Sequence, residues 1–140
     1  MLKLREERAQ SLVELTLVLP FFLLLIMAIV DLGWAMRAQI TVTNASREGA
    51  RLGVTCQTDA AIIDQVVNYS SGLLEPSDVE VVQNPCSSGA YTGTTGLPVE
   101  VKVTYEYHYI SPFGGILHFV TSGVVPSPLP LSGSTEMRVE

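Results

Sequence analysis

Positive charge is scarce in this chain, and most of it lies near the N-terminus. The 140 residues include eight Lys or Arg against 14 Asp or Glu. Beyond Leu52 only Lys102 and Arg138 are basic, against nine carboxylates, which gives this part a formal charge of −7. Because such a surface repels a phosphate backbone, the sequence excludes nucleic acid as a partner.

Cysteine is also rare. Cys56 and Cys86 are the only two, and their spacing fits no zinc site. In an oxidising compartment they could close one loop through a disulfide, and a pair of buried free thiols is the other interpretation. Neither cysteine has an obvious base nearby in the sequence, which argues against a catalytic thiol.

Motifs of catalysis are missing as well. The sequence contains no glycine-rich phosphate loop, no His and Cys cluster with metal spacing and no Gly-x-Ser-x-Gly turn. His108 and His118 have no evident acidic or metal partner, so we expect surface or packing roles for them. The sequence therefore predicts neither an enzyme nor a bound metal or cofactor.

The chain has a single long apolar run, which begins directly after Glu14. Leu15–Val30 is free of charge and would extend about 24 Å as a helix. Continued to Met36, the run is interrupted only by Asp31 and reaches about 33 Å, which matches a hydrocarbon core of about 30 Å. We expect one membrane-spanning helix.

A cleaved secretory signal is the competing interpretation of a basic start followed by an apolar run. The run is longer than the usual apolar core of about 7–15 residues, carries Glu14 at its start and lacks a small-x-small site at its end. Lys3, Arg5 and Arg8 precede the span, whereas only Arg37 follows closely. This asymmetry favours a cytoplasmic N-terminus.

The first helix is expected to continue beyond the membrane as far as Gly53. Small or apolar residues recur at helical spacing on one face, at Ala38, Thr41, Val42, Ala45, Gly49, Leu52 and Gly53. Pro20 should kink this helix without ending it. The predicted domains are a basic leader over 1–9, the helix over 10–53 and a head outside the membrane over 54–140.

Within the head, a second helix should begin at Thr58 or Asp59, which can cap it, and end near Gly72. The segment 111–125 is apolar without strand alternation, so a short helix and a loop packed against a partner or lipid headgroups both stay open. Its last two residues begin the proline-rich tract 124–133.

The strongest strand signal is Leu97–Ile110. Valines and tyrosines share one face, at Val99, Val101, Val103, Tyr105, Tyr107 and Tyr109. This face needs cover, which the two helices can supply, so we interpret the tyrosines as core residues rather than an aromatic binding face. Strands at 78–83 and 134–140 complete a three- or four-stranded antiparallel sheet, and the fold class is α+β.

Two acids flank the apolar run. A lone carboxylate in hydrocarbon costs several kcal/mol, so it becomes neutral, reaches the interface or pairs with a cation. Glu14, in the first turn of the span, could lie at headgroup depth, favoured by the helix dipole. Asp31 is expected to be solvated at the interface or paired with a neighbouring subunit, because Arg37 is too far along the same helix.

A basic stretch, the small residue Ala9 and then "QSLVE" precede the apolar run. This pattern resembles the processing region of type IV pilins, most closely that of the TadE-like pseudopilins. The resemblance continues through "LVELTLVLPFFLLLIMAIVDLGWAM" and "NASREGAR", and more loosely in the closing "STEMRVE". Ala9 stands where that family usually has glycine, and Leu15 where it often has an aromatic residue.

The resemblance implies a structural minor pilin or pseudopilin that takes part in assembly of a tight-adherence, Flp-type, type IV pilus. A prepilin peptidase would cut after Ala9, and Gln10 would become the new N-terminus. The Glu14 carboxylate would then pair with the amine of Gln10 on a neighbour and align the subunits.

The partners implied by the resemblance are the lipid bilayer, other pilins or pseudopilins, the pilus assembly platform and the prepilin peptidase. The expected location is the bacterial cytoplasmic membrane, with the head outside. The alternative interpretation is a single-pass, membrane-tethered binding module in which Glu14 is incidental.

Overall fold

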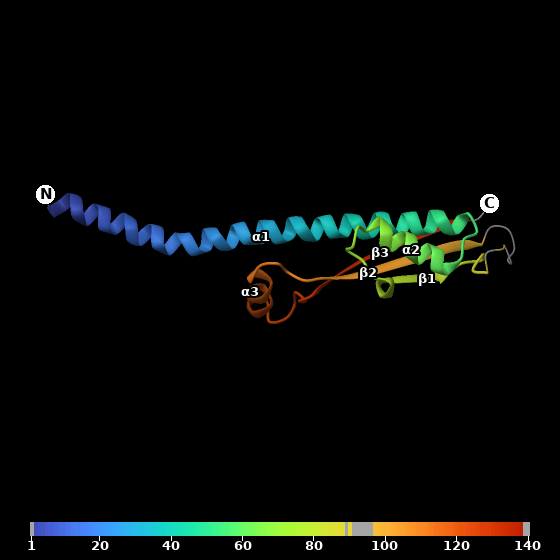
Figure 1. Cartoon of the computed structure of the whole chain (residues 1–140). Coiled ribbons are helices and arrows are strands. Elements are labelled where there is room, and N and C mark those ends of the chain that lie inside the picture. The colour runs from blue at the N-terminus through green and yellow to red at the C-terminus, as the bar shows by residue number, and fades with distance from the viewer. Residues whose placement is uncertain (1, 89, 91–96, 139–140) are drawn as a thin grey trace. The chain divides into compact units, whose positions relative to one another are not determined.

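The computed structural model describes residues 2–88, 90 and 97–138, and the side chains of these residues from Gln10 onward except Phe113. The elements, in order, are α1 (Leu2–Val54), α2 (Asp59–Tyr69), the 3-10 turn η1 (Pro76–Asp78), β1 (Val79–Gln83), β2 (Pro98–Tyr107), α3 (Phe113–Val120) and β3 (Leu129–Arg138) (Figure 1). A long apolar helix, a second helix and a three-stranded antiparallel sheet confirm the predicted α+β class.

The chain divides into two compact units. Unit 1 comprises Met1–Trp34 and Tyr109–Ser127, and unit 2 comprises Ala35–His108 and Pro128–Glu140. Helix α1 therefore contributes its first part to unit 1 and its last part to unit 2. This division follows packing rather than the course of the helix, so the domain boundaries expected at residues 9 and 53 stay predictions.

Helix α1 runs through Pro20 without a break, as predicted, and ends at Val54. Proline has no N–H, so the carbonyl of Thr16 one turn earlier loses its usual helix donor. The Thr16 hydroxyl itself donates to the carbonyl of Leu12 at 2.7 Å. Figure 1 shows α1 bending in its blue N-terminal part, the part that contains this proline.

The sheet has the order β1-β2-β3 with both pairs antiparallel. Val79 lies opposite Val103 and Glu80 opposite Lys102 in the first pair, and Pro98 opposite Arg138 in the second. The predicted alternation of β2 is confirmed: the valine face, Val99, Val101 and Val103, is fully buried, Tyr107 is buried and Tyr105 half-buried. These tyrosines are core residues.

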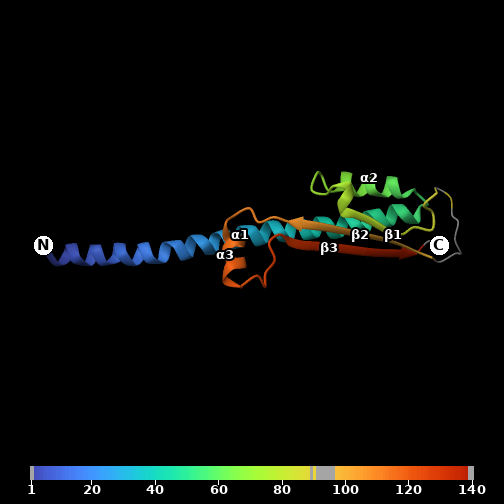
Figure 2. The ribbon, with the colours of Figure 1, turned by 90° about the horizontal axis from the view of Figure 1, so that it is seen from below.

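The core of unit 2 lies between this valine face and two helices. Val42 and Ala45 of α1 and Ile62 and Val66 of α2 are fully buried against it, and Figure 2 shows α2 and the sheet beside the later part of α1. Gly49 permits this close approach, because a Cβ there would lie 2.6 Å from Cγ2 of Val66. Small residues on α1 thus let the helix sit close to its neighbours.

Helix α2 begins as the sequence predicts. Thr58 is its N-cap, and the Thr58 hydroxyl accepts a hydrogen bond from the N–H of Ala61. The helix ends at Tyr69, slightly earlier than expected, and the chain then turns through Ser71 and Gly72, which both have positive φ. Glycine adopts this left-handed conformation without steric cost.

Strand β3 is longer than predicted. The sequence indicates a strand only from Ser134, whereas β3 begins at Leu129 and includes Pro130. Because β3 is an edge strand, the missing N–H of a proline can be accommodated there. The carbonyl of Ser132 accepts a hydrogen bond from Gln39 Nε2 at 3.0 Å, which ties the strand to α1.

Candidate membrane and assembly site

The first half of α1 presents an exposed apolar surface. Between Leu12 and Met36 most large apolar side chains are exposed, for example Leu17 at 65% and Phe21 at 74%. By length and composition the helix is able to cross a membrane, and none of its most apolar window is buried within the chain. Such a surface is unfavourable in water and suits a lipid or protein environment.

Glu14 is the charged group on this surface. Its side chain is exposed and, with Gln10, Val13 and Leu17, lines one shallow face of α1. No hydrogen bond or ion pair joins Glu14 to any residue that the structure describes. A partner for its carboxylate in an apolar environment would therefore have to come from outside those residues.

The proposed processing residues, Ala9 and Gln10, both lie within α1. The Gln10 side chain is exposed, and the Ala9 side chain lies outside the described part of the chain. Gln10 is one helical turn before Glu14, which places the two on the same face. Cleavage between Ala9 and Gln10 stays a prediction.

Asp31 corrects the sequence-based expectation. Its side chain is buried, at 1% exposure. Oδ1 accepts hydrogen bonds from the N–H groups of Ile110 at 3.0 Å and Ser111 at 3.3 Å, and Oδ2 accepts one from the Ser111 hydroxyl. The burial shows that the expected interfacial solvation is wrong, because donors of the same chain replace the water around this carboxylate. The pairing with a neighbouring subunit stays a prediction.

The Asp31 contact could not be found from local sequence, because its donors lie about 80 residues away. Ser111 directly precedes Pro112, the N-cap residue of α3. Asp31 thus fixes the entry to the segment that the sequence left open between helix and loop. We call residues 109–127, all within unit 1, the α3 segment.

Contacts between nearby residues hold the α3 segment in its conformation. Gly114 lies so close to the ring of Tyr109 that a side chain there would collide with it. Gly123, with positive φ, donates its N–H to the carbonyl of His118 at 2.9 Å and ends the helix. The His118 side chain is exposed, and its Nδ1 lies 3.0 Å from the carbonyl of Val125, which agrees with the surface or packing role expected for this histidine. His108 is exposed.

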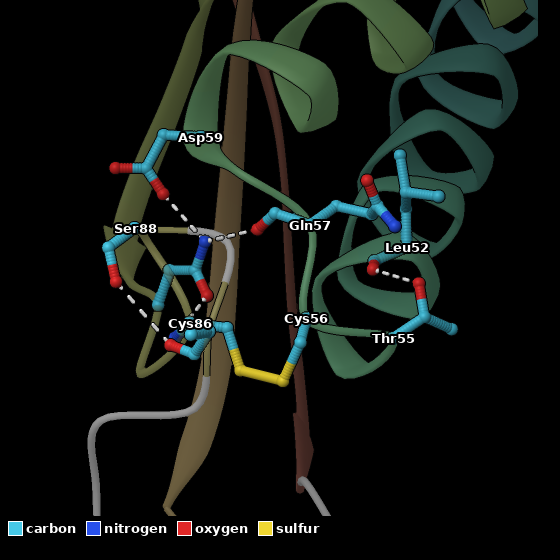
Figure 3. Close-up of a disulfide and its surroundings, with 9 residues drawn as sticks. Leu52, Thr55, Cys56, Gln57, Asp59, Cys86 and Ser88 are labelled. Atoms are coloured by element: carbon cyan, nitrogen blue, oxygen red, sulfur yellow. Dashed lines mark hydrogen bonds between the residues drawn. A yellow bond between two sulfur atoms is a disulfide. The ribbon is translucent and has the colours of Figure 1, made fainter.

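A disulfide joins Cys56, just after α1, to Cys86, just after β1 (Figure 3). Asn84 supports this corner, because its Nδ2 donates to the carbonyl of Gln57 at 3.0 Å and to Oδ1 of Asp59 at 2.7 Å. Its own Oδ1 accepts from the N–H of Cys86 at 2.9 Å. The bond closes a loop around α2 and restricts the unfolded chain.

The later part of α1 carries one surface ion pair. Arg51 donates through Nε to Oε2 of Glu48 at 3.0 Å and through a terminal guanidinium nitrogen to Oε1 at 2.6 Å. This hydrogen bond lowers the pKa of the Glu48 carboxyl below its ordinary value. The two residues are three positions apart, so they are neighbours on the helix surface.

Comparison with known proteins identifies one family. Residues 9–51 match the family described as TadE-like protein, which confirms the resemblance predicted from the sequence. The match begins at Ala9 and covers the larger part of α1, including Gln10, Glu14 and Asp31. Neither the curated proteins nor the solved structures include a match to this chain.

Proposed function

We propose that this chain is a structural minor pilin or pseudopilin that takes part in assembly of a tight-adherence, Flp-type, type IV pilus. The observation that carries the proposal is the match to the TadE-like family over residues 9–51. That stretch holds both the candidate processing bond and the exposed apolar part of α1. The family is structural, which agrees with the lack of catalytic motifs in the sequence.

Helix α1 anchors the subunit once in the cytoplasmic membrane, with the N-terminus in the cytoplasm and unit 2 outside. Its exposed apolar side chains contact lipid before assembly and the helices of other pilins after it. The pilus assembly platform and the prepilin peptidase meet the chain at the cytoplasmic end. Unit 2, with its own closed core, is the part that meets other head regions.

Glu14 sets the register between subunits. Its carboxylate has no partner among the described residues and projects from an apolar helix face. After cleavage the amine of Gln10 on a neighbour supplies a compensating positive charge. A helix shifted along its axis would leave both charges unpaired in apolar surroundings, so the pair selects one alignment while apolar packing supplies adhesion.

Cleavage is tested by intact mass of the full chain from its host, with and without the prepilin peptidase. We expect a loss of residues 1–9 only when the peptidase is present. Ala9→Gly restores the family's usual residue and should be processed, whereas Ala9→Leu should not. A full-length mass in both strains would contradict processing, and an N-terminus elsewhere would indicate a secretory signal.

Alignment is tested with Glu14→Gln, a nearly isosteric change that removes the charge. Removing one partner of a buried ion pair costs about 3–5 kcal/mol, so incorporation into isolated pili should fall by more than about a hundredfold. Glu80→Gln, a matched change at an exposed residue of β1, serves as control. Normal incorporation of Glu14→Gln would remove Glu14 from the mechanism.

A membrane-tethered binding module is the second candidate. It is favoured by unit 2, which has a closed core of its own, and by the acidic charge beyond Leu52. In that case Glu14→Gln and the peptidase deletion would both leave the protein unchanged in amount, mass and location. The same two experiments therefore separate the candidates.

A further inference from the structure

We propose that the α3 segment lies in the outer membrane–water interface as a second, shallow contact with the lipid bilayer. This inference rests on the proposed membrane anchoring by α1. It adds a lipid-contacting surface that is distant in sequence from the spanning helix.

The first observation is an exposed apolar face. Ile116, Phe119 and Val120 are spaced three and four residues apart, so they share one face of α3. Their side chains are exposed, Phe119 at 85% and Val120 at 71%. Val124, four residues after the end of the helix, is a further exposed apolar side chain of the segment, at 82%. Single exposed apolar residues are ordinary, but a cluster of this kind marks a contact surface.

The second observation is the charge of the segment. Residues 109–127 contain no Asp, Glu, Lys or Arg, and His118 is their only histidine. Insertion into the headgroup region therefore desolvates no fixed charge. A surface built for a polar protein partner would be expected to carry complementary charge, which this segment lacks.

The third observation is the depth at which the segment is held. Asp31 is the first residue beyond the uncharged stretch Leu15–Val30 and lies near the outer end of the span, which is expected to continue to Met36. Its carboxylate holds Ile110 and Ser111, the residues that lead into α3. Figures 1 and 2 both show α3 beside α1 within unit 1. In the proposed placement, the apolar face of α3 meets the bilayer next to the part of α1 that belongs to the same unit.

The burial of Asp31 supports the same placement. An acid at the rim of the hydrocarbon core is stable when donors replace its water. The backbone N–H groups of Ile110 and Ser111 and the hydroxyl of Ser111 provide them. The contact therefore satisfies an acid in the interface and positions an apolar helix there. Interfacial helices of this type bury their apolar face about 5–10 Å into the headgroup and acyl boundary.

The test uses the full chain in phospholipid vesicles and a single tryptophan as depth reporter. Trp34 is the only tryptophan, so Trp34→Phe gives a silent background. In that background Phe119→Trp reports on α3, and Val124→Trp repeats the measurement at a second exposed position. Phe22→Trp reports on the span, and Val82→Trp, on an exposed position of β1, reports on unit 2.

Lipids carry bromine either near the headgroup end of the acyl chain or near its tail end. We expect the emission of the two α3 reporters, Phe119→Trp and Val124→Trp, to be lost mainly with bromine near the headgroup end. The emission of the span reporter, Phe22→Trp, should be lost mainly with bromine near the tail end. The emission of the unit 2 reporter, Val82→Trp, should be lost with neither. This pattern places α3 in the interface, with unit 2 in water.

Three results would overturn the inference. If both α3 reporters resist bromine while the span reporter is quenched, α1 spans the bilayer but α3 does not touch it. If the α3 reporters resist both bromine and aqueous acrylamide, a neighbouring protein surface covers α3 instead of lipid. If the span reporter also resists bromine, the membrane anchoring fails and takes the inference with it.

Discussion

The two halves of α1 follow opposite packing rules along one continuous helix. In the first half, large apolar side chains such as Leu17 and Phe21 point outward and are exposed. In the second half, the side chains that face the core include small, fully buried ones, such as Ala45 and Ala50. A change of surroundings along one helix would explain the difference, because the second half packs against the sheet, whereas none of the most apolar window of the first half is buried in the described chain.

The comparison teaches that apolarity alone does not define a core. The first half is more apolar than the second, yet it buries almost nothing within the described chain. The second half packs closely because glycine and alanine let α2 and β2 approach, as at Gly49. Large apolar side chains that are exposed indicate a surface that contacts something outside the chain. Small side chains that are buried indicate close packing within the chain.

The largest expected effect comes from placing the same charge in either half. Val42→Asp buries a carboxylate in the core of unit 2 and should cost more than about 4 kcal/mol, enough to unfold that unit. Leu25→Asp should leave its thermal unfolding unchanged but weaken membrane insertion by about 3–4 kcal/mol. Circular dichroism in detergent and membrane fractionation measure the two effects. Equal melting temperatures for both variants would refute the contrast.

A smaller effect is expected from adding volume at two glycines of α1, one in each half of the helix. A Cβ at Gly49 would meet Val66, whereas nothing lies within 4 Å of a Cβ at Gly33. Gly49→Val should therefore destabilise unit 2 by about 1–3 kcal/mol through overpacking. Gly33→Val should leave the melting temperature of unit 2 unchanged. A similar decrease in both variants would show that helix propensity, not packing, decides the result.

The smallest effect concerns the ion pair on the exposed face of the second half. The pKa of Glu48 is lowered by its hydrogen bond to Arg51, so the folded state binds the proton less tightly than the unfolded state. Its contribution to stability is present at neutral pH and is lost as the pH falls through the depressed pKa. The melting difference between the parent and Glu48→Gln should be small at neutral pH and vanish in acid.

That difference should also shrink at high salt, because both groups lie at the surface and are screened. A difference that grows as the pH falls would reverse the sign and contradict the assignment. The result compares two contributions to the stability of unit 2 in the second half of α1, a surface ion pair and the packing of small residues. We expect the ion pair to contribute less.

Much of the fold could be predicted because its signals are periodic and local. The C-terminal end of α1, the cap of α2 at Thr58 and the alternation of β2 all depend on neighbouring residues. The N-terminal end of α1 was not predicted, because the helix was expected from Gln10 and begins at Leu2. The beginning of β3 could not be predicted, because Pro130 argues against a strand unless the strand is known to lie at a sheet edge. Edge position is a property of the assembled sheet and is not encoded in adjacent residues.

The candidate site also has a part that could be predicted from the sequence and a part that could not. The family resemblance around Ala9, Gln10 and Glu14 could be recognised from spacing, and the family match confirms it. The environment of Asp31 could not, because its donors are distant in sequence and two of them are backbone N–H groups. A backbone donor leaves no trace in residue identity, and only Ser111 gives any chemical hint.

The buried carboxylate of Asp31 has one more consequence. Its hydrogen-bond donors belong to the same chain. These donors would therefore stay with it if the helix moved from one medium to another. Of the two acids that flank the apolar run, only Glu14 lacks a partner among the described residues and would need one after such a transfer. If the subunit passes from lipid into a fibre as proposed, the surroundings of Glu14 would have to change, whereas the donors of Asp31 would stay in place.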